Sequence, residues 1–235
     1  MVADEHSTPH RLPPTRSVDR VRYLLDLARN RSVLHVGFVG RGVVELGGAG
    51  GLPWLHAELA GVASKLVGLD IDEDSVARAG NLGYEAYVAD CSDPDRLAGA
   101  AVPPGELVIA GEIIEHMEAP GMFLEAMKLL VAPGGLLAIT TPNSASLLNP
   151  LAAVGGYEMV HPDHVALYSW YTLTNLLSRH GWTVRQFRTY HRPSFPRPTR
   201  SVAHVVADMA SGFQRAAARW WPFLDFGLIA AVSRS

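Results

Sequence analysis

The apolar positions of the chain form short runs that alternate with segments of helical spacing. Apolar residues at helical spacing follow Ser17, the expected N-cap, and continue to Asn30. Further helices are expected at 55–63, 73–81, 120–131 and 171–180. Compact apolar runs predict strands at 33–37, 66–70, 86–89, 107–110, 136–140, 182–190 and 226–232. Strands that alternate with helices indicate an α/β fold with a parallel sheet and right-handed crossovers.

The two ends of this pattern differ from the middle. Residues 1–16 are polar and contain three prolines, so a flexible N-terminal arm is expected. Residues 17–235 are expected to form one domain, because a chain of 235 residues can bury one large core. A segment at about 191–222, rich in proline and arginine before it turns helical, is expected to be an insertion before the last strand.

Charge and cysteine content restrict the expected partners. Lysine and arginine number 20 against 23 acidic residues, so the formal net charge is −3, without a basic cluster. Neither nucleic acid nor a membrane surface is therefore an expected partner, and the oligomeric state stays open. The single cysteine, Cys91, cannot form an internal disulfide, and the first residues lack the apolar run of a secretory signal. A cytoplasmic location is expected.

The residues that end the strands carry the candidate chemistry, because doubly wound sheets bind ligands at the carboxyl ends of their strands. In chain order these residues are Gly37 with Phe38, Asp70, Asp90 with Cys91, and Gly111 with Glu112. Glycine lets a ligand approach the backbone closely, and a carboxylate such as Asp70 can accept hydrogen bonds from a ribose diol. The set predicts a nucleotide-like ligand.

Five stretches resemble class I S-adenosylmethionine-dependent methyltransferases, the group that includes the ubiquinone-biosynthesis type. They are VLHVGFVG (33–40), LVGLDID (66–72), VADCSD (88–93), LVIAGEIIEHMEAPGMFLEAMKLLVAPGGLLAITTPN (107–143) and HPDHVALYSWYTLTNLLSRHGW (161–182). Each is weak alone, but their order and spacing together are specific. The resemblance implies a Rossmann-like, doubly wound, mostly parallel seven-stranded sheet with an antiparallel last strand, and S-adenosylmethionine as cofactor.

The same resemblance implies roles for individual residues. The strand with His35, followed by Gly37 and Phe38, would line the methionine end of the cofactor. Asp70 would hold the ribose hydroxyls and Ile71 would pack on adenine. Asp90 and the backbone of Cys91 would bind the adenine amino group, and Gly111 with Glu112 would face the methionine ammonium.

The first glycine turn departs from the family pattern in two ways. His35 stands where the family usually has an acid, and about ten extra residues, 42–51, precede the next helix. A second placement of the motif, ELGGAGG at 45–51, puts Glu45 nearer the usual distance from Asp70. We favour 33–40, because a helix leads straight into it, with 47–51 then acting as a lid; the alternative stays open.

Three histidines are candidates for a direct role. By the resemblance, His161 and His164 lie over the transferred methyl group, where an imidazole could act as general base toward a hydroxyl or hold the loop closed. His116 could act directly or orient a loop. No metal site is expected, because the 161–164 cluster lies on one short turn without a distant partner in the spacing.

The predicted function is methyl transfer to a small-molecule acceptor, with oxygen as the leading acceptor atom. The alternative is an NAD(P)-binding Rossmann protein, either a reductase or a non-catalytic sensor. The turn at Gly37 lacks the G-x-G-x-x-G spacing, which favours the methyltransferase. A degenerate methyltransferase fold that serves as a binding partner is a further possibility, against which the acids at the strand ends argue.

Overall fold

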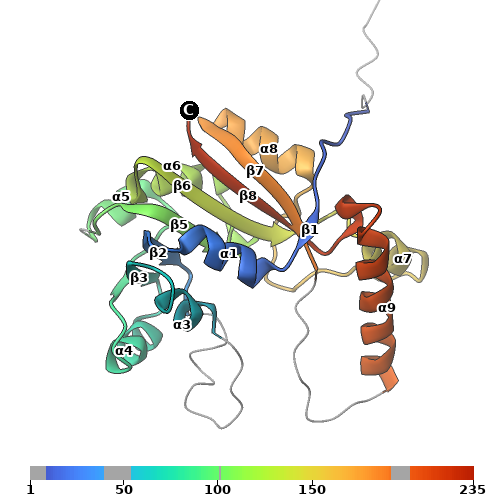
Figure 1. Cartoon of the computed structure of the whole chain (residues 1–235), viewed down its shortest axis with the longest axis horizontal. Coiled ribbons are helices and arrows are strands. Elements are labelled where there is room, and N and C mark those ends of the chain that lie inside the picture. Colours follow the sequence, from blue (N-terminus) through green and yellow to red (C-terminus); the bar gives the residue numbers. More distant parts are fainter. Residues whose placement is uncertain (1–8, 40–53, 101, 192–201) are drawn as a thin grey trace, which may run out of the picture.

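A parallel sheet with one antiparallel strand forms the centre of the molecule (Figure 1). The computed structural model describes residues 9–39, 54–100, 102–191 and 202–235, with only the backbone for 202–207. In these residues the sheet has eight strands, in the order β1-β7-β8-β6-β5-β2-β3-β4. The strands are β1 (Ser17–Val18), β2 (Ser32–Val36), β3 (Lys65–Asp70), β4 (Ala86–Val88), β5 (Gly105–Gly111), β6 (Val131–Pro142), β7 (Trp182–Tyr190) and β8 (Gly227–Arg234).

The directions of the strands confirm the predicted doubly wound, Rossmann-like sheet. β2 pairs in parallel with both β3 and β5, and the order reverses there, as in a doubly wound fold. The last strand, β8, runs antiparallel to both of its neighbours, β6 and β7. The prediction of seven strands missed β1, a two-residue edge strand that pairs with Thr189 and Tyr190 of β7.

This edge strand also corrects the expected start of the first helix. Ser17 lies in β1, and the N-cap of α1 (Arg20–Ala28) is Asp19, whose carboxylate accepts from the Arg22 amide at 2.8 Å. Either side chain is a suitable cap by type. The pairing of Ser17 with β7 decides between them, and this pairing joins residues far apart in the chain.

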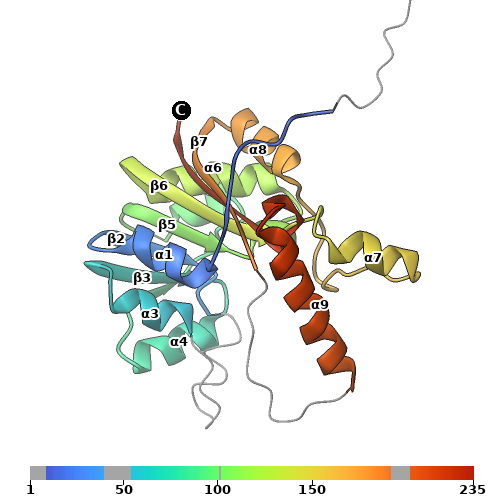
Figure 2. The same cartoon turned by 45° about the vertical axis from the view of Figure 1, so that its right-hand side comes forward.

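Helices cover both faces of the sheet, as Figures 1 and 2 show. On one face lie α1, α3 (Leu55–Ala60) and α4 (Glu73–Asn81), and on the other lie α5 (Pro94–Ala98), α6 (Pro120–Leu130) and α8 (Trp170–Arg179). Helices α7 (Leu148–Val154) and α9 (Val202–Ala218) lie next to one another to one side of the sheet, and short 3₁₀ turns occupy η1 (Ile114–His116) and η2 (Pro222–Leu224). Among the helices described, none has the length and apolarity needed to cross a bilayer.

The two apolar layers follow from the alternation of side chains along each strand. On β5, Leu107 and Ile109 join the core beneath α1 and α3, whereas Val108 and Ala110 join the core beneath α6 and α8. All four side chains are buried. A strand buried on both faces reads as a continuous apolar run, which is why the sequence predicted this element well.

The described part of the N-terminal segment contacts both β7 and α8. Thr15 Oγ1 donates to the Phe187 carbonyl at 2.9 Å, and the ring of His10 stacks on Tyr171 at 3.9 Å between centroids. In residues 9–16, the described part of the expected flexible arm, Thr15 therefore bonds to the edge of the sheet and His10 packs on α8. Along the chain, α9 and η2 lie between β7 and β8, at the position where the sequence analysis expected an insertion.

Candidate active site

The carboxyl ends of β2, β3 and β5 meet at one edge of the sheet. Val36 pairs with Leu69 on one side and with Ala110 on the other, so the residues that follow these strands come together. The Gly37 amide donates to the Leu69 carbonyl at 2.8 Å and extends the pairing by one residue. The predicted strand-end residues of these three strands therefore lie close together. The sequence analysis expected this, because apolar runs marked the strands and parallel strands share one carboxyl edge.

Asp70 faces the turn that follows β2. Its Oδ2 accepts from the Val39 amide and its Oδ1 from the Asp72 amide, each at 3.2 Å. Each carboxylate oxygen retains capacity for a further bond. The next side chain, Ile71, is 66% exposed, although it is a large apolar residue. A carboxylate beside an exposed apolar side chain suits a ligand with both a diol and a flat ring.

The turn at Gly37 requires glycine on internal grounds. Its φ is +64°, and a Cβ there would lie 2.4 Å from Ile113 Cδ1. A larger residue would therefore strain the turn whether or not a ligand binds. For this reason a substitution at Gly37 tests folding and ligand binding together.

The other residues predicted around this turn have buried side chains. Phe38 packs in an aromatic cluster with Trp54, His56 and Tyr84, so it can contribute only its backbone to the edge. Its carbonyl accepts from Trp54 Nε1 at 2.8 Å. His35 faces His56 of α3, with the two Nδ1 atoms 3.3 Å apart, and is also buried.

Asp90 has protein partners of its own. Its carboxylate accepts from Ser92 Oγ at 2.6 Å and from Arg96 Nη1 at 2.7 Å. These bonds, with that of Ser92 as the larger cause, lower the pKa of Asp90 to about 2. Cys91 is buried, and burial raises the pKa of its thiol to about 12, so the thiol stays protonated.

Glu112 lies in a polar network at the end of β5. Its φ is +56°, and its Oε1 accepts from Tyr190 Oη at 2.6 Å and from Thr140 Oγ1 at 2.9 Å. Arg20 of α1 approaches the same carboxylate at 3.8 Å, and its Nε is buried without a hydrogen-bond partner among the described residues. A Cβ on Gly111 would come within 3.7 Å of Arg20 Nη1.

Arg20 and Tyr190 were missed by the sequence analysis. Arg20 comes from α1 and Tyr190 from the end of β7, and both reach Glu112 only in the folded chain. An arginine at the start of a helix is unremarkable by type, and Tyr190 ends a strand in which apolar and polar residues are mixed. In the described part of the chain, the helix before the first glycine turn begins with two arginines, Arg20 and Arg22, and this was the available indication.

Glu115 is a second functional candidate that the sequence analysis did not single out. It lies in η1, is 0% exposed, and its Oε2 accepts from Thr141 Oγ1 at 2.9 Å. Its Oε1 has no hydrogen-bond partner in the described part of the chain. Burial and then the charge of Glu112 raise the pKa of Glu115 to about 8.

The three predicted histidines lie together beside Glu115. The ring centroid of His164 is 4.7 Å from that of His116 and 5.3 Å from that of His161. His116 Nδ1 lies 3.0 Å from the Asp163 carbonyl, and His161 Nδ1 accepts from the Asp163 amide at 3.3 Å. Burial, followed by the nearby imidazoles, lowers the pKa of His164. The structure therefore places His116, His161 and His164 in one cluster.

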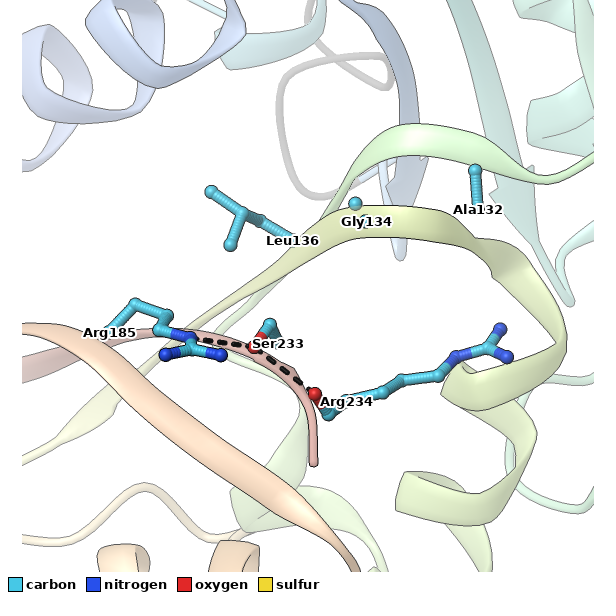
Figure 3. Close-up of a pocket in the computed structure, with 7 residues that line it drawn as sticks. Ala132, Gly134, Leu136, Arg185, Ser233 and Arg234 are labelled. Atoms are coloured by element: carbon cyan, nitrogen blue, oxygen red, sulfur yellow. Dashed lines mark hydrogen bonds between the residues drawn. The ribbon is translucent and has the colours of Figure 1, made fainter.

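A separate pocket of about 280 Å³ lies away from this edge (Figure 3). It is lined by the first residues of β6 and the last of β8, which is the opposite end of the parallel strands. Arg185 and Arg234 both border it, but their guanidinium groups point in different directions.

The second placement of the glycine motif, 45–51, lies outside the described residues.

Comparisons with known proteins define the family. A family model described as a methyltransferase domain matches residues 18–186. Among solved structures, a SAM-dependent methyltransferase of Archaeoglobus fulgidus aligns with a TM-score of 0.54 at 17% identity, covering 90% of both chains. Magnesium protoporphyrin IX methyltransferase of Synechocystis PCC 6803, with bound SAH, aligns with a TM-score of 0.56 at 13% identity, covering 92% of this chain and 82% of that chain. These likenesses show a shared fold.

Curated relatives match over part of their length. The ubiquinone biosynthesis O-methyltransferase of Caulobacter sp. (strain K31) is 28% identical over 126 residues, which cover 50% of this chain and 47% of that protein. The enzyme of the same description from Parvibaculum lavamentivorans is 28% identical over 157 residues, 62% of this chain and 58% of that protein. The chain thus spans about half the length of the curated relatives it matches.

The family model, together with the fold, assigns the chain to the class of S-adenosylmethionine-dependent methyltransferases. The chain belongs to the methyltransferase-domain family, whose model matches well over half of its length. S-adenosylmethionine is the cofactor of this class, and the expected alternative, an NAD(P)-binding protein, does not agree with the family.

Proposed function

We propose that this chain transfers a methyl group from S-adenosylmethionine to a hydroxyl oxygen of a small molecule. The family supports methyl transfer, and the choice of oxygen follows from the O-methyltransferase relatives. The observation that carries the proposal is the carboxylate of Asp70 at the carboxyl edge, bonded to two backbone amides and open to further donors.

The residues at this edge fit the chemical parts of the cofactor. Asp70 suits the two ribose hydroxyls, and the exposed Ile71 suits a face of adenine. At the other end, Glu112 would attract the methionine ammonium, and Arg20 would attract its carboxylate. The backbone of Cys91 would bind the adenine amino group, and Asp90 would do so with an oxygen that also accepts from Arg96.

The chemistry demands little covalent participation from the protein. S-adenosylmethionine supplies a methyl group on a sulfonium sulfur. The protein has to hold the acceptor hydroxyl in line with that group and away from water. It must also help the hydroxyl lose its proton, and His116, His161 and His164 are the groups proposed for this task.

Calorimetry with S-adenosylhomocysteine and with NADPH tests the cofactor. We expect S-adenosylhomocysteine alone to bind, and Asp70→Ala to weaken its binding by about 2–4 kcal/mol, the loss of two charge-assisted hydrogen bonds. Asp74→Ala, on the exposed first turn of α4, is the matched control and should bind as the wild type does. Unchanged affinity in a folded Asp70→Ala protein would refute the assignment.

The acceptor is identified by screening. Hydroxylated metabolites, sugars and small acids are incubated with the protein and S-adenosylmethionine, and release of S-adenosylhomocysteine is measured. Mass spectrometry of the product then shows whether the new methyl group is on oxygen. A product methylated on nitrogen or carbon would contradict the proposed acceptor atom.

A further inference from the structure

We propose that the outward face of helix α9 binds the same face of a second copy of this chain, so that two copies form a symmetric dimer. This face consists of four exposed residues, which we call the α9 seam: Met209, Phe213, Ala216 and Trp220. Met209 is 71% exposed, Phe213 62% and Trp220 80%. The proposal uses none of the residues assigned to the cofactor, so it stands apart from the proposed function.

The opposite face of α9 is the one that docks on the rest of the molecule. Gln214 is buried, and its side-chain amide donates to Ser146 Oγ at 2.6 Å and to the Leu224 carbonyl at 2.9 Å. Ala218, one turn later, is also buried. Because successive residues turn by about 100° around a helix axis, Gln214 and Ala218 lie on one side of α9 and the α9 seam lies on the other. The described residues therefore leave the seam uncovered.

The same helix has a separate polar side that suits contact with water. Asp208, Arg215 and Arg219 are exposed and lie between the docked face and the α9 seam. A helix that met only solvent on its outer side would carry polar residues there, whereas this one carries Phe213 and Trp220. Contiguous exposed apolar side chains of this size mark a surface that binds something.

The spacing of the α9 seam is that of a helix that packs on another helix. Its residues follow one another at steps of four, three and four, which keeps a stripe of side chains facing a partner helix. The helical turn continues as far as Trp220, whose amide donates to the Ala217 carbonyl at 3.0 Å. Small residues flank the seam, namely Ala210, Gly212 and Ala217, so a second backbone can approach closely.

An antiparallel arrangement makes the α9 seam complementary to itself. A two-fold axis midway between positions 214 and 215 places Phe213 of one copy against the small Ala216 of the other. The same axis places Met209 against Trp220, and a methionine sulfur packs favourably on an aromatic ring. Each of these contacts occurs twice, because a two-fold axis repeats every pair.

The area of the α9 seam suits a weak dimer. An aromatic side chain buries about 150–250 Å², so the exposed parts of Phe213 and Trp220 amount to roughly 200–350 Å² per copy. Met209 and the small flanking residues extend this area, and two copies together then bury on the order of 1,000 Å². A contact of this size is at the lower end of specific interfaces, so we expect the dimer to dissociate at micromolar concentrations.

Other occupants fit the α9 seam less well. The seam runs about 16 Å along the helix, so a small-molecule acceptor would cover only part of it. A lipid surface favours helices whose polar side is rich in lysine and arginine, whereas the exposed polar side described above combines two arginines with Asp208. A second copy covers the whole seam.

Sedimentation equilibrium of the full chain tests the dimer. We expect the wild type to change from monomer to dimer across the micromolar range, and Phe213→Gln and Trp220→Gln each to raise the dissociation constant at least about tenfold. The matched control is Leu82→Gln, which removes a 55% exposed apolar side chain at the end of α4 and should dimerise as the wild type does. Circular dichroism confirms that each variant is folded.

Chemical cross-linking tests the antiparallel arrangement. In that arrangement the two copies of position 216 lie near the axis, whereas the two copies of position 209 are about 16 Å apart along the helices. We expect a short bismaleimide to cross-link Ala216→Cys but not Met209→Cys. Cys91 is buried and is present in both variants. Equal cross-linking of the two variants would overturn the antiparallel arrangement.

The remaining outcomes separate the occupants of the α9 seam. A wild type that stays monomeric at every concentration, or a dimer that both glutamine variants leave unchanged, would overturn the proposal. A monomeric wild type that binds phosphatidylglycerol vesicles, with Phe213→Gln unable to do so, would assign the seam to lipid and also overturn it. Calorimetry should show that Phe213→Gln binds S-adenosylhomocysteine as the wild type does, so the result for the dimer is independent of the proposed function.

Discussion

The buried pair of His35 and His56 makes the fold sensitive to acid. His35 of β2 and His56 of α3 are both nearly or wholly inaccessible, and His56 Nε2 has no hydrogen-bond partner among the described residues. Burial lowers the pKa of His56 from 6.5 to about 4. Burial, and then the charge that His56 would carry, lowers the pKa of His35 well below 6.5.

The sign of the effect follows from proton binding. In the unfolded chain these imidazoles bind protons near pH 6.5, whereas in the folded chain His56 binds its proton only near pH 4. Between these values the unfolded state binds more protons, so the free energy of unfolding falls as the pH falls. Each pH unit below 6.5 costs about 1.4 kcal/mol per histidine, so His56 alone removes about 2 kcal/mol at pH 5.

Urea unfolding at pH 7 and pH 5 measures this loss. In His56→Phe the new ring lies among Phe38, Trp54 and Tyr84. Between pH 7 and pH 5 we expect its free energy of unfolding to fall by about 2 kcal/mol less than that of the wild type. The control is Gly212→Ala, which adds a methyl group in open space and removes no ionisable group, so it should keep the full acid sensitivity of the wild type. The reasoning is refuted if folded His56→Phe loses as much stability at pH 5 as the wild type.

Three further predictions concern single side chains. His161→Ala should lower turnover by roughly two to four orders of magnitude while affinity for S-adenosylhomocysteine is kept; a fall in thermal stability with weaker binding of both ligands would instead indicate a structural role. Gly227→Ala should destabilise the fold by at least about 1–3 kcal/mol in urea, because its Cβ would lie 2.0 Å from the Tyr190 ring, whereas Gly212→Ala, with nothing within 4 Å, should be neutral or stabilising. Carboxyl NMR titration should show a higher pKa of Asp90 in both Ser92→Ala and Arg96→Ala, because each of these side chains donates a hydrogen bond to its carboxylate; an unchanged pKa in either variant would contradict this account.

The positions of the strand-end residues could be predicted from short stretches of sequence. Asp70 was predicted at the ligand edge because an apolar run followed by an acid marks the end of a buried strand. The rule that parallel strands share one carboxyl edge then placed it beside Gly37 and Gly111. The structure brings these three together, although whether they bind the cofactor stays a prediction.

The sequence motifs predicted where these residues lie but not the directions in which their side chains point. Phe38 stands in the expected turn, yet its ring enters the aromatic cluster with Trp54. Asp90 ends the region of β4 as expected, yet it bonds to Ser92 and Arg96. The direction of a side chain depends on the space that residues distant in sequence leave for it. The sequence motif does not specify that space, because the space exists only after the chain has packed.

The sequence by itself determined most of the helices and strands and the mostly parallel sheet. These follow from local apolar periodicity, from turn residues and from topology rules that hold for all such folds. The class of cofactor followed from the resemblance of the strand-end motifs to a known family. Only the tertiary structure decided that Ser17 forms an edge strand on β7, that Tyr190 and Arg20 meet Glu112, and that Glu115 lies against His164. Each of these contacts joins residues far apart in the chain, so it exists only once the sheet and its helices are packed.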